Sequence, residues 1–259
     1  MKEWSRELVD PGVCEILLDS FCDFAPLITN EFNNTRRYVW RGQRCEDWPL
    51  ESSLARRIKR NKKQTAPAKL AELQLTRFRK AARGRRGTNA PKLSDDELWA
   101  LGQHFGLATP LLDWTVSPYV ALYFAFAEPG NTTQTENRVV YALHRPEVAS
   151  CSKEIVKGFP DQAHDTIRFF EPDSDENARV LSQRGLFSVG PVSSSIDEWV
   201  QKHLGDGADD IIVRILVPDN DRAQCLKMLN RMNINHLTLF PDLIGAAEFT
   251  NIHLDVLNY

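Results

Sequence analysis

The run Trp114-Thr-Val-Ser-Pro-Tyr-Val-Ala-Leu-Tyr-Phe-Ala-Phe-Ala-Glu-Pro-Gly130 carries the clearest structural signal in the chain. Ser117 is a residue type that caps helix N-termini, and Pro118 suits the first helical position. Pro129 and Gly130 predict the end of this helix. Because nearly every residue between these signals is apolar, we expect the helix to be buried on all sides within the protein core.

The segments on either side of this helix mix strand and helix patterns without regular alternation. This order favours an α+β domain, with a mixed or antiparallel sheet and flanking helices, over a doubly wound parallel sheet. A chain of 259 residues can form a single domain, residues 1–259. β-branched and aromatic residues predict strands at residues 37–41, 138–143, 178–181, 186–189 and 211–217. Apolar periodicity predicts helices at residues 13–21, 66–82, 94–104, 196–203 and 220–232.

Charge is distributed unevenly along the chain, although the formal net charge is −3. Residues 54–92 hold 14 Lys or Arg and one acid, Glu72, which is a net charge of +13. The rest of the chain holds 18 basic and 34 acidic residues, which is −16. A solvated basic surface is the commoner outcome of such a helical and loop insertion, and contact with nucleic acid is the alternative. The candidate nucleic-acid contacts are Arg77, Arg79, Lys80, Arg83, Arg85 and Arg86.

Composition and missing motifs narrow the class of protein. Apolar residues make up 42% of the chain, and its longest apolar run, residues 116–127, is far short of the roughly 20 residues that span a bilayer. The N-terminus lacks the apolar region of a secretory signal, so we expect a cytoplasmic protein without membrane contact. Five scattered cysteines predict reduced thiols, and six isolated histidines predict no metal site. Dinucleotide-fold, P-loop, zincin and α/β-hydrolase motifs are absent from the sequence.

The first run of polar residues at an apolar strand is Tyr38-Val-Trp-Arg-Gly-Gln-Arg44. It places Arg41 at a strand end, directly before Gly42 and Gln43. A guanidinium fork matches phosphate or carboxylate with two hydrogen bonds. The sequence leaves two roles open for Arg41: it binds an anionic ligand, or it pairs with an internal carboxylate.

The second run, residues 101–118, gathers Gln103, His104, Asp113, Thr115 and Ser117 among apolar residues. The free N–H groups of a helix beginning at Ser117 favour a bound phosphate or diphosphate. The alternative is that His104 and Asp113 satisfy each other and that Ser117 merely caps the helix.

Two further runs carry polar residues in core-like surroundings. The first, within residues 168–189, places Asn177, Arg179 and Gln183 in a segment that otherwise resembles a core strand. The second, residues 235–247, ends at a helix start where Asp242 either caps the helix or pairs with a basic residue.

These four runs, in this order, resemble the FRG domain family, which is named for a Phe-Arg-Gly strand. Here Trp40 takes the place of Phe in Trp40-Arg-Gly-Gln43, and the resemblance covers residues 36–250. It implies a toxin or phage-defence effector that a cognate antitoxin or inhibitor restrains. The matching segments that follow are Trp48-Pro-Leu-Glu-Ser-Ser-Leu-Ala-Arg56, Gln103-His-Phe-Gly-Leu-Ala-Thr109, Leu111-Leu-Asp-Trp-Thr115, Ala121-Leu-Tyr-Phe-Ala125, Asn177-Ala-Arg179, Gln183-Arg-Gly-Leu-Phe187 and Leu239-Phe-Pro-Asp-Leu243.

A more distant likeness is to ADP-ribosyltransferases of the Arg-Ser-Glu type. It implies an ADP-ribosyltransferase-like fold that consumes NAD. Arg179 stands where this family has its catalytic Glu, and a cation cannot stabilise an oxocarbenium-like transition state. Glu176, Glu171 or Asp113 could supply the missing charge, or the chemistry has been lost or changed.

The likeness implies a set of site residues. Arg41 would hold the NAD diphosphate, Thr115 and Ser117 would organise the nicotinamide end, and Trp114 would stack. The candidate catalytic residues are His104, Asp113, Glu176 and Arg179. The candidate NAD-binding residues are Arg41, Gly42, Gln43, Trp114, Thr115, Ser117 and Gln183.

Three function classes therefore remain open. The first is an NAD-consuming enzyme that acts on a protein or a nucleic acid. The second is a non-catalytic module that binds nucleic acid or a partner through residues 54–92. The third is another chemistry, such as metal-independent hydrolysis of a nucleotide or nucleic acid.

Overall fold

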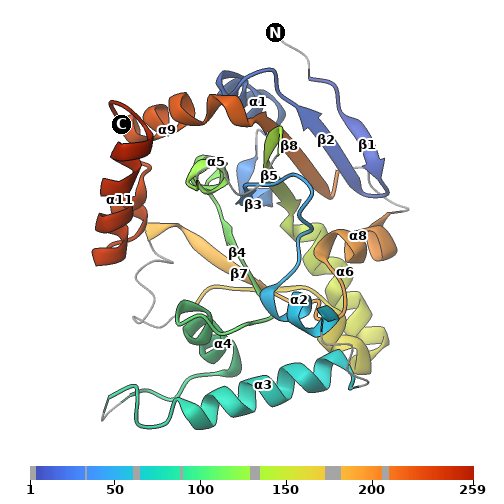
Figure 1. The fold of residues 1–259 in the computed structure, drawn as a ribbon. Helices are drawn as coiled ribbons and strands as arrows, with labels where there is room; N and C mark the ends of the chain where they lie inside the picture. The colour runs from blue at the N-terminus through green and yellow to red at the C-terminus, as the bar shows by residue number, and fades with distance from the viewer. Residues whose placement is uncertain are drawn as a thin grey trace.

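The computed structural model describes residues 4–32, 34–60, 65–87, 90–128, 135–172, 182–205 and 210–259. Its strands form a mixed eight-stranded sheet in the order β1-β2-β8-β5-β3-β4-β7-β6 (Figure 1). Strands β2 and β8 pair in parallel, and the other neighbours pair antiparallel. The strands are β1 (Glu7–Asp10), β2 (Val13–Leu17), β3 (Tyr38–Gln43), β4 (Leu111–Thr115), β5 (Asn137–His144), β6 (Arg168–Phe170), β7 (Gly185–Val189) and β8 (Ile212–Pro218).

Helices flank the sheet, which confirms the expected α+β domain with a mixed sheet. The α-helices are α1 (Phe24–Glu31), α2 (Ser53–Arg60), α3 (Pro67–Ala81), α4 (Asp95–His104), α5 (Pro118–Phe126), α6 (Arg145–Gly158), α8 (Ile196–Leu204), α9 (Arg222–Arg231), α10 (His236–Leu239) and α11 (Leu243–Asp255). The short 3-10 helices are η1 (Phe21–Asp23), η2 (Thr35–Arg37), η4 (Pro160–Asp165) and η5 (Asp219–Asp221).

Two layers of helices bury the two faces of the sheet. Helices α1, α5 and α9 pack on one face, around Trp40 of β3 and Ile215 of β8. Helices α6 and α8 pack on the other, around Tyr141 of β5 and Trp199 of α8. A smaller cluster joins α2, α3 and α4 to β4 and β7, and Figure 1 shows these three helices together at one end of the molecule. Successive side chains of a central strand therefore join different layers: Val140 and Ala142 of β5 pack on one face, and Val139, Tyr141 and Leu143 pack on the other.

Local signals predict several elements correctly. The Ser117 hydroxyl accepts a hydrogen bond from the Val120 N–H at 3.4 Å, and Pro118 is the first residue of α5. Buried residues cover most of α5, as its apolar sequence predicts. Asp242 caps α11 by accepting from the Gly245 N–H at 2.9 Å. The predicted helix stop at residues 129–130 and the predicted strand at residues 178–181 lie outside the described residues.

The helix predicted at residues 13–21 is wrong, because residues 13–17 form strand β2. Pro11 and Gly12 form the turn that joins it to β1, and Gly12 has a φ of 77°, a value that favours glycine. Strand β2 then pairs in parallel with β8, with Val13 opposite Ile212 and Leu17 opposite Leu216. This non-local ladder outweighs an apolar pattern that fits a helix equally well.

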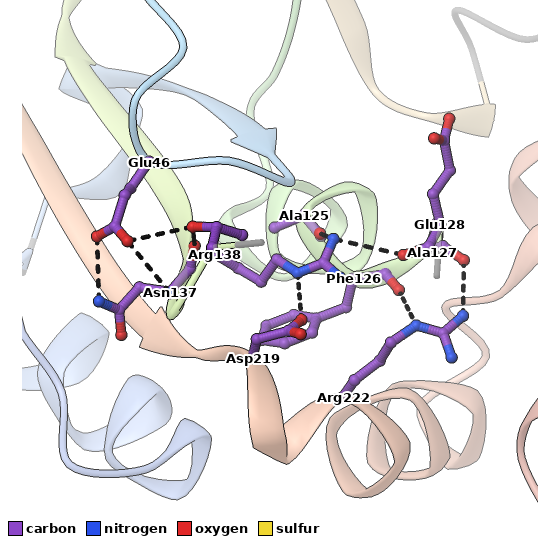
Figure 2. Close-up of polar contacts among 10 residues, drawn as sticks. Glu46, Ala125, Phe126, Ala127, Glu128, Asn137, Arg138, Asp219 and Arg222 are labelled. Carbon is purple, nitrogen blue, oxygen red and sulfur yellow. Dashed lines mark hydrogen bonds and ion pairs between the residues drawn. The ribbon is translucent and has the colours of Figure 1, made fainter. Parts of the chain in front are cut away.

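Two arginines hold the C-terminal end of α5 (Figure 2). Arg138 Nη1 donates to the carbonyl of Ala125 at 3.1 Å, and its Nε donates to Asp219 Oδ1 at 2.5 Å. Arg222 donates to the carbonyls of Phe126 and Ala127 at 3.0 and 3.1 Å. These bonds occupy carbonyls that a helix end leaves unsatisfied, so the last turn of α5 is fixed against β5 and α9.

Within the described residues, no helix is both long and apolar enough to cross a bilayer. None of the five cysteines, all of which have described positions, forms a disulfide.

Candidate active site at the split between two strands

Strands β3 and β4 separate almost as soon as they meet. Their ladder contains one residue pair, Trp40 with Thr115. By contrast, β3 pairs with β5 along its whole length, from Tyr38 to Gln43. The backbone groups beyond the Trp40–Thr115 pair therefore lose their ladder partners, and the sheet is split at this point.

Arg41 closes part of this split with its side chain. Its Nη1 donates to the main-chain carbonyl of Asp113 at 2.8 Å and lies 3.7 Å from a carboxylate oxygen of the same residue. Arg41 is 24% exposed and Asp113 is 61% exposed. Both predicted roles of Arg41 thus have a basis, because the guanidinium is tied to β4 and still reaches the surface of the cleft.

Gln103, at the end of α4, fixes the Asp113 side chain. Its Nε2 donates to Asp113 Oδ1 at 2.8 Å, and its carbonyl oxygen accepts from the Thr109 hydroxyl. Thr109 is fully buried, and its N–H donates to the Ser53 hydroxyl at 3.0 Å. The sequence indicated a His104–Asp113 contact as one alternative. In the structure the Asp113 carboxylate instead contacts the side chains of Gln103 and Arg41.

A cavity of about 340 Å³, here called the split cavity, opens between the two strands. Its volume lies within the range of small-molecule sites. Arg41 contributes a cation and Asp113 a carboxylate, while aromatic rings provide much of the remaining wall. The lining residues are Trp40, Arg41, Gly42, Asp113, Trp114, Thr115, Phe124, Gln183 and Phe240.

Gly42, which lines the split cavity, is needed for the packing of α5 on β3. A Cβ atom at this position would lie 1.9 Å from the carbonyl oxygen of Ala121 and 2.5 Å from the backbone nitrogen of Ala125. Helix α5 therefore lies against β3 at a distance that only glycine permits. This close approach brings Phe124 of α5 into the cavity wall.

Thr115 and Gln183 join the two walls of the split cavity. The Thr115 hydroxyl donates to the carbonyl of Gln183 at 2.8 Å and accepts from the Ser117 N–H at 3.1 Å. The Gln183 side chain donates to the Leu239 carbonyl at 3.2 Å. Trp114 is 3% exposed, and its indole N–H donates to the Ser188 hydroxyl at 2.9 Å, which gives this ring a role in the core.

Two more cavities meet the split cavity at Arg41. The arginine cavity, of about 620 Å³, contains Arg41, Arg44, Arg56 and Arg60 together with Trp48, Gln43 and Glu128. The loop cavity, of about 320 Å³, lies between α2 and the α4–β4 loop and contains Arg41, Arg56, Arg57, Gln103 and Asp113. Arg41 and Arg56 line both of these cavities, so the cavities adjoin at these two residues.

The electrostatics at Arg41 are those of a site poised for an anion. Burial lowers the pKa of Arg41, Asp113 opposes this shift, and the charge of Arg56 adds to it. Mutual repulsion of two nearby guanidinium groups is relieved by a bound anion. The Arg41 Nε and the neighbouring Trp40 Nε1 are buried donors without an acceptor among the described residues. An unmade hydrogen bond of this kind costs roughly 1–3 kcal/mol.

Some predicted site residues lie away from the split cavity. His104 is exposed at the end of α4, where its ring packs edge-on against Phe105. Ser117 acts as the cap of α5 and is absent from the cavity lining. Glu171, an alternative source of negative charge, lies 3.7 Å from Arg145. Glu176, Asn177 and Arg179 lie outside the described residues.

The six predicted nucleic-acid contacts belong to α3 and the loop after it. Arg77, Arg79 and Lys80 are exposed on α3, and Arg79 pairs with Asp95 of α4. Arg85 donates to the carbonyl of Ala81 at 2.5 Å. None of the six lines the three cavities described above.

Sequence reasoning missed the residues that complete the cleft from distant segments. They are Arg44, Trp48, Arg56, Arg60, Phe124 and Phe240. Arg56 and Arg60 had a readable signal, since residues four apart share one face of a helix. Among the residues with described positions, no three His, Cys, Asp or Glu side chains are grouped as metal ligands.

Part of the chain is similar to a known protein family. Searches of the curated proteins and of the solved structures found no match. A family model, that of the FRG domain, matches residues 36–134. The match begins just before β3 and extends past α5, so it contains Arg41, Asp113 and Phe124, whereas Gln183 and Phe240 complete the split cavity from outside it. Residues 36–134 are therefore similar to the FRG domain, and the split between β3 and β4 lies within this segment.

Proposed function

We propose that this protein is an ADP-ribosyltransferase-like enzyme that takes NAD as its substrate at the split cavity. The observation that carries the proposal is the placement of Arg41 and Asp113 on the two separating strands, with one wall of the cavity on each. A cation and a carboxylate at one cleft suit a substrate that carries phosphates and whose sugar becomes positively charged during reaction.

Arg41 would face the phosphates of the dinucleotide. Its guanidinium makes one hydrogen bond to the protein among the described residues, to the Asp113 carbonyl, and so keeps donors for a ligand. Its buried Nε has no acceptor among the described residues, which supports a ligand that brings one. Phe124 and Phe240 offer aromatic walls to the flat, uncharged part of a ligand.

Asp113 would stabilise the reacting sugar. In the proposed step the bond between the nicotinamide nitrogen and ribose C1′ breaks, and its electron pair stays with nicotinamide. The acceptor atom forms a new bond to C1′, and its proton passes to Asp113. Within the described part of the chain, Asp113 is the one carboxylate that lines the split cavity, and Gln103 holds it in place. We therefore assign to Asp113 the charge that Arg179 cannot provide.

The proposed reaction releases nicotinamide, so mass spectrometry of NAD incubated with the protein tests it. Wild type should convert NAD to nicotinamide plus ADP-ribose or an ADP-ribosylated acceptor. Unchanged NAD in the presence of candidate protein and nucleic-acid acceptors would contradict the proposal. At the level of the cell, we propose a toxin or phage-defence role, which predicts that expression slows growth and that Asp113→Asn relieves this effect.

A second candidate function is a non-catalytic module that binds nucleic acid through α3. The exposure of Arg77 and Lys80 and the absence of a carboxylate contact for either among the described residues favour it. It predicts an affinity for nucleic acid that falls steeply with salt and is lost in Arg77→Ala/Lys80→Ala. Affinity that does not change with salt would remove this candidate.

A further inference from the structure

We propose that the arginine cavity and the loop cavity form one track for the phosphate backbone of a single-stranded nucleic acid, which is the acceptor for the reaction at the split cavity. This inference rests on the proposed function and names its second substrate.

The shape is that of a passage. The arginine cavity and the loop cavity lie on either side of Arg41 and Arg56, which line both. Neither cavity is enclosed, so both open to solvent, and they share the lining residues Arg41 and Arg56. A small nucleotide needs a pocket with one mouth, whereas a polymer needs entry and exit.

The track carries more positive than negative charge. Its lining includes the carboxylates Glu51, Asp113 and Glu128 and the five arginines Arg41, Arg44, Arg56, Arg57 and Arg60. Arg56 and Arg60 stand one turn apart on α2, about 6 Å along the helix axis. Among the described residues, neither has a carboxylate partner; Arg56 donates to the Glu51 carbonyl at 2.5 Å. Arg44 pairs with Glu128, which is 66% exposed, so a phosphate can replace this carboxylate. Successive cations that lack partners suit a polyanion.

The track also carries an aromatic platform. Trp48 is 39% exposed and lines the arginine cavity, and the Arg44 guanidinium lies 4.8 Å from the centre of its ring. Bases of single-stranded nucleic acids stack on aromatic rings and on guanidinium planes. A duplex keeps its bases stacked on one another and cannot use such a platform.

The position places the polymer beside the reacting atoms. Arg41 lines all three cavities, and Asp113 lines both the split cavity and the loop cavity. A strand that passes over Arg41 and Arg56 therefore presents a base or sugar to the carboxylate proposed to accept its proton. The α3 residues Arg77, Arg79 and Lys80, which the sequence gives as candidate nucleic-acid contacts, do not line this track.

The test is binding of a fluorescent single-stranded oligonucleotide of about 12 nucleotides, measured by anisotropy without NAD. The test variant is Arg56→Ala/Arg60→Ala. The matched control is Lys153→Ala/Lys157→Ala, which removes the same charge at the same spacing from exposed positions on α6. We expect the test variant to lose about tenfold or more in affinity and its log–log salt slope to fall by about 1.4, at 0.7 per phosphate contact. We expect the control to match wild type.

Further measurements distinguish a polymer from a mononucleotide as the source of phosphate, and distinguish oligonucleotide binding from NAD binding. AMP, ADP and a duplex of the same sequence should bind more weakly than the single strand; mononucleotide binding of equal strength would overturn the polymer track. Equal losses in the test and control variants would assign binding to overall charge and also overturn it. Loss confined to Arg77→Ala/Lys80→Ala would move binding to α3. Because no NAD is present, a failed NAD assay leaves this result intact. A final outcome concerns Arg56→Ala/Arg60→Ala. If this variant binds NAD more weakly but binds the oligonucleotide as wild type does, the arginine cavity holds the NAD diphosphate, and the inference is overturned.

If Arg56→Ala disturbs the path of α2, the single variant Arg60→Glu provides the readout. Arg60 is exposed at the last residue of α2 and makes no polar contact with another described residue. Charge reversal there should weaken oligonucleotide binding at least as much as Arg60→Ala does. Unchanged affinity in a folded Arg60→Glu protein would contradict the track.

Discussion

Arg41 Nη1 lies 2.8 Å from the main-chain oxygen of Asp113 and donates a hydrogen bond across the gap where β3 and β4 separate. A side chain here takes over a hydrogen bond that a continued ladder would have made. The arginine is therefore both a strut between two strands and a cation in the wall of a cavity. This double role explains how the sheet can be split without leaving the Asp113 carbonyl unsatisfied.

The Asp113 carboxylate is expected to act on the chemical step. Asp113→Asn keeps the shape and the acceptor for Gln103 but removes the charge, so kcat should fall by about 100-fold or more with little change in KM. Gln103→Ala should have a smaller effect, because it frees the carboxylate to rotate without removing it. Steady-state kinetics of NAD consumption measures both. If Asp113→Asn keeps the wild-type kcat, the Asp113 carboxylate has no catalytic role.

Gly42 is expected to be essential for the packing of α5. In Gly42→Ala the new methyl group would meet the Ala121 carbonyl, so we expect a loss of about 3 kcal/mol in the free energy of unfolding. The control is Gly158→Ala, at the end of α6, where a Cβ meets nothing within 4 Å. That change should be neutral or slightly stabilising. The urea midpoint should therefore fall in Gly42→Ala and stay the same or rise slightly in Gly158→Ala. Equal curves for the two variants would argue against the close approach of α5 and β3.

Acid is expected to destabilise the fold through His144, which is 7% exposed and packs edge-on against Tyr38. Burial lowers its pKa below the ordinary value of 6.5, Arg37 lowers it further, and Glu147 opposes the shift. The unfolded chain then binds the proton first, so stability is complete above about pH 6.5 and falls as pH drops toward the folded pKa.

Replacement of this histidine should flatten that profile. One group changes the free energy of unfolding by at most about 1.4 kcal/mol per pH unit. His144→Phe keeps an aromatic ring against Tyr38 and should reduce the slope between about pH 6.5 and 5. Chemical denaturation at a series of pH values gives the slope, and an unaltered slope in His144→Phe would assign acid sensitivity to other groups.

Local sequence signals predicted the parts of the fold that depend on neighbouring residues. The cap at Ser117, the proline at position 118 and the apolar surface of α5 all act within one segment, and each is confirmed. The same holds for Asp242 at the start of α11. Strand β2 was mistaken for a helix because its stability comes from β8, about 200 residues away. The sequence predicts no strand over residues 111–115 for a similar reason, since β7 supplies the partner of β4.

The candidate site could be predicted in its residue types but not in its shape. Arg41 and Asp113 both stood out as polar residues among apolar ones, yet they lie 72 positions apart and no periodicity joins them. His104 and its neighbour Gln103 are both polar residues among apolar ones. The direction in which each side chain leaves α4 decides that Gln103, and not His104, reaches Asp113. Phe240 and Trp48 read as ordinary aromatic residues because the cavity walls exist only after the sheet has split.

Calorimetric titration of NAD into wild type and Arg41→Ala tests whether the split cavity is the NAD site. We expect NAD to bind wild type. Arg41→Ala, checked for its fold by circular dichroism, should bind at least about tenfold more weakly, because a charged phosphate contact is lost. Arg41→Lys should recover part of the loss, since it restores the charge without the fork. Equal NAD affinity in wild type and a folded Arg41→Ala protein, or no NAD binding to wild type, would contradict the assignment of the split cavity as the NAD site.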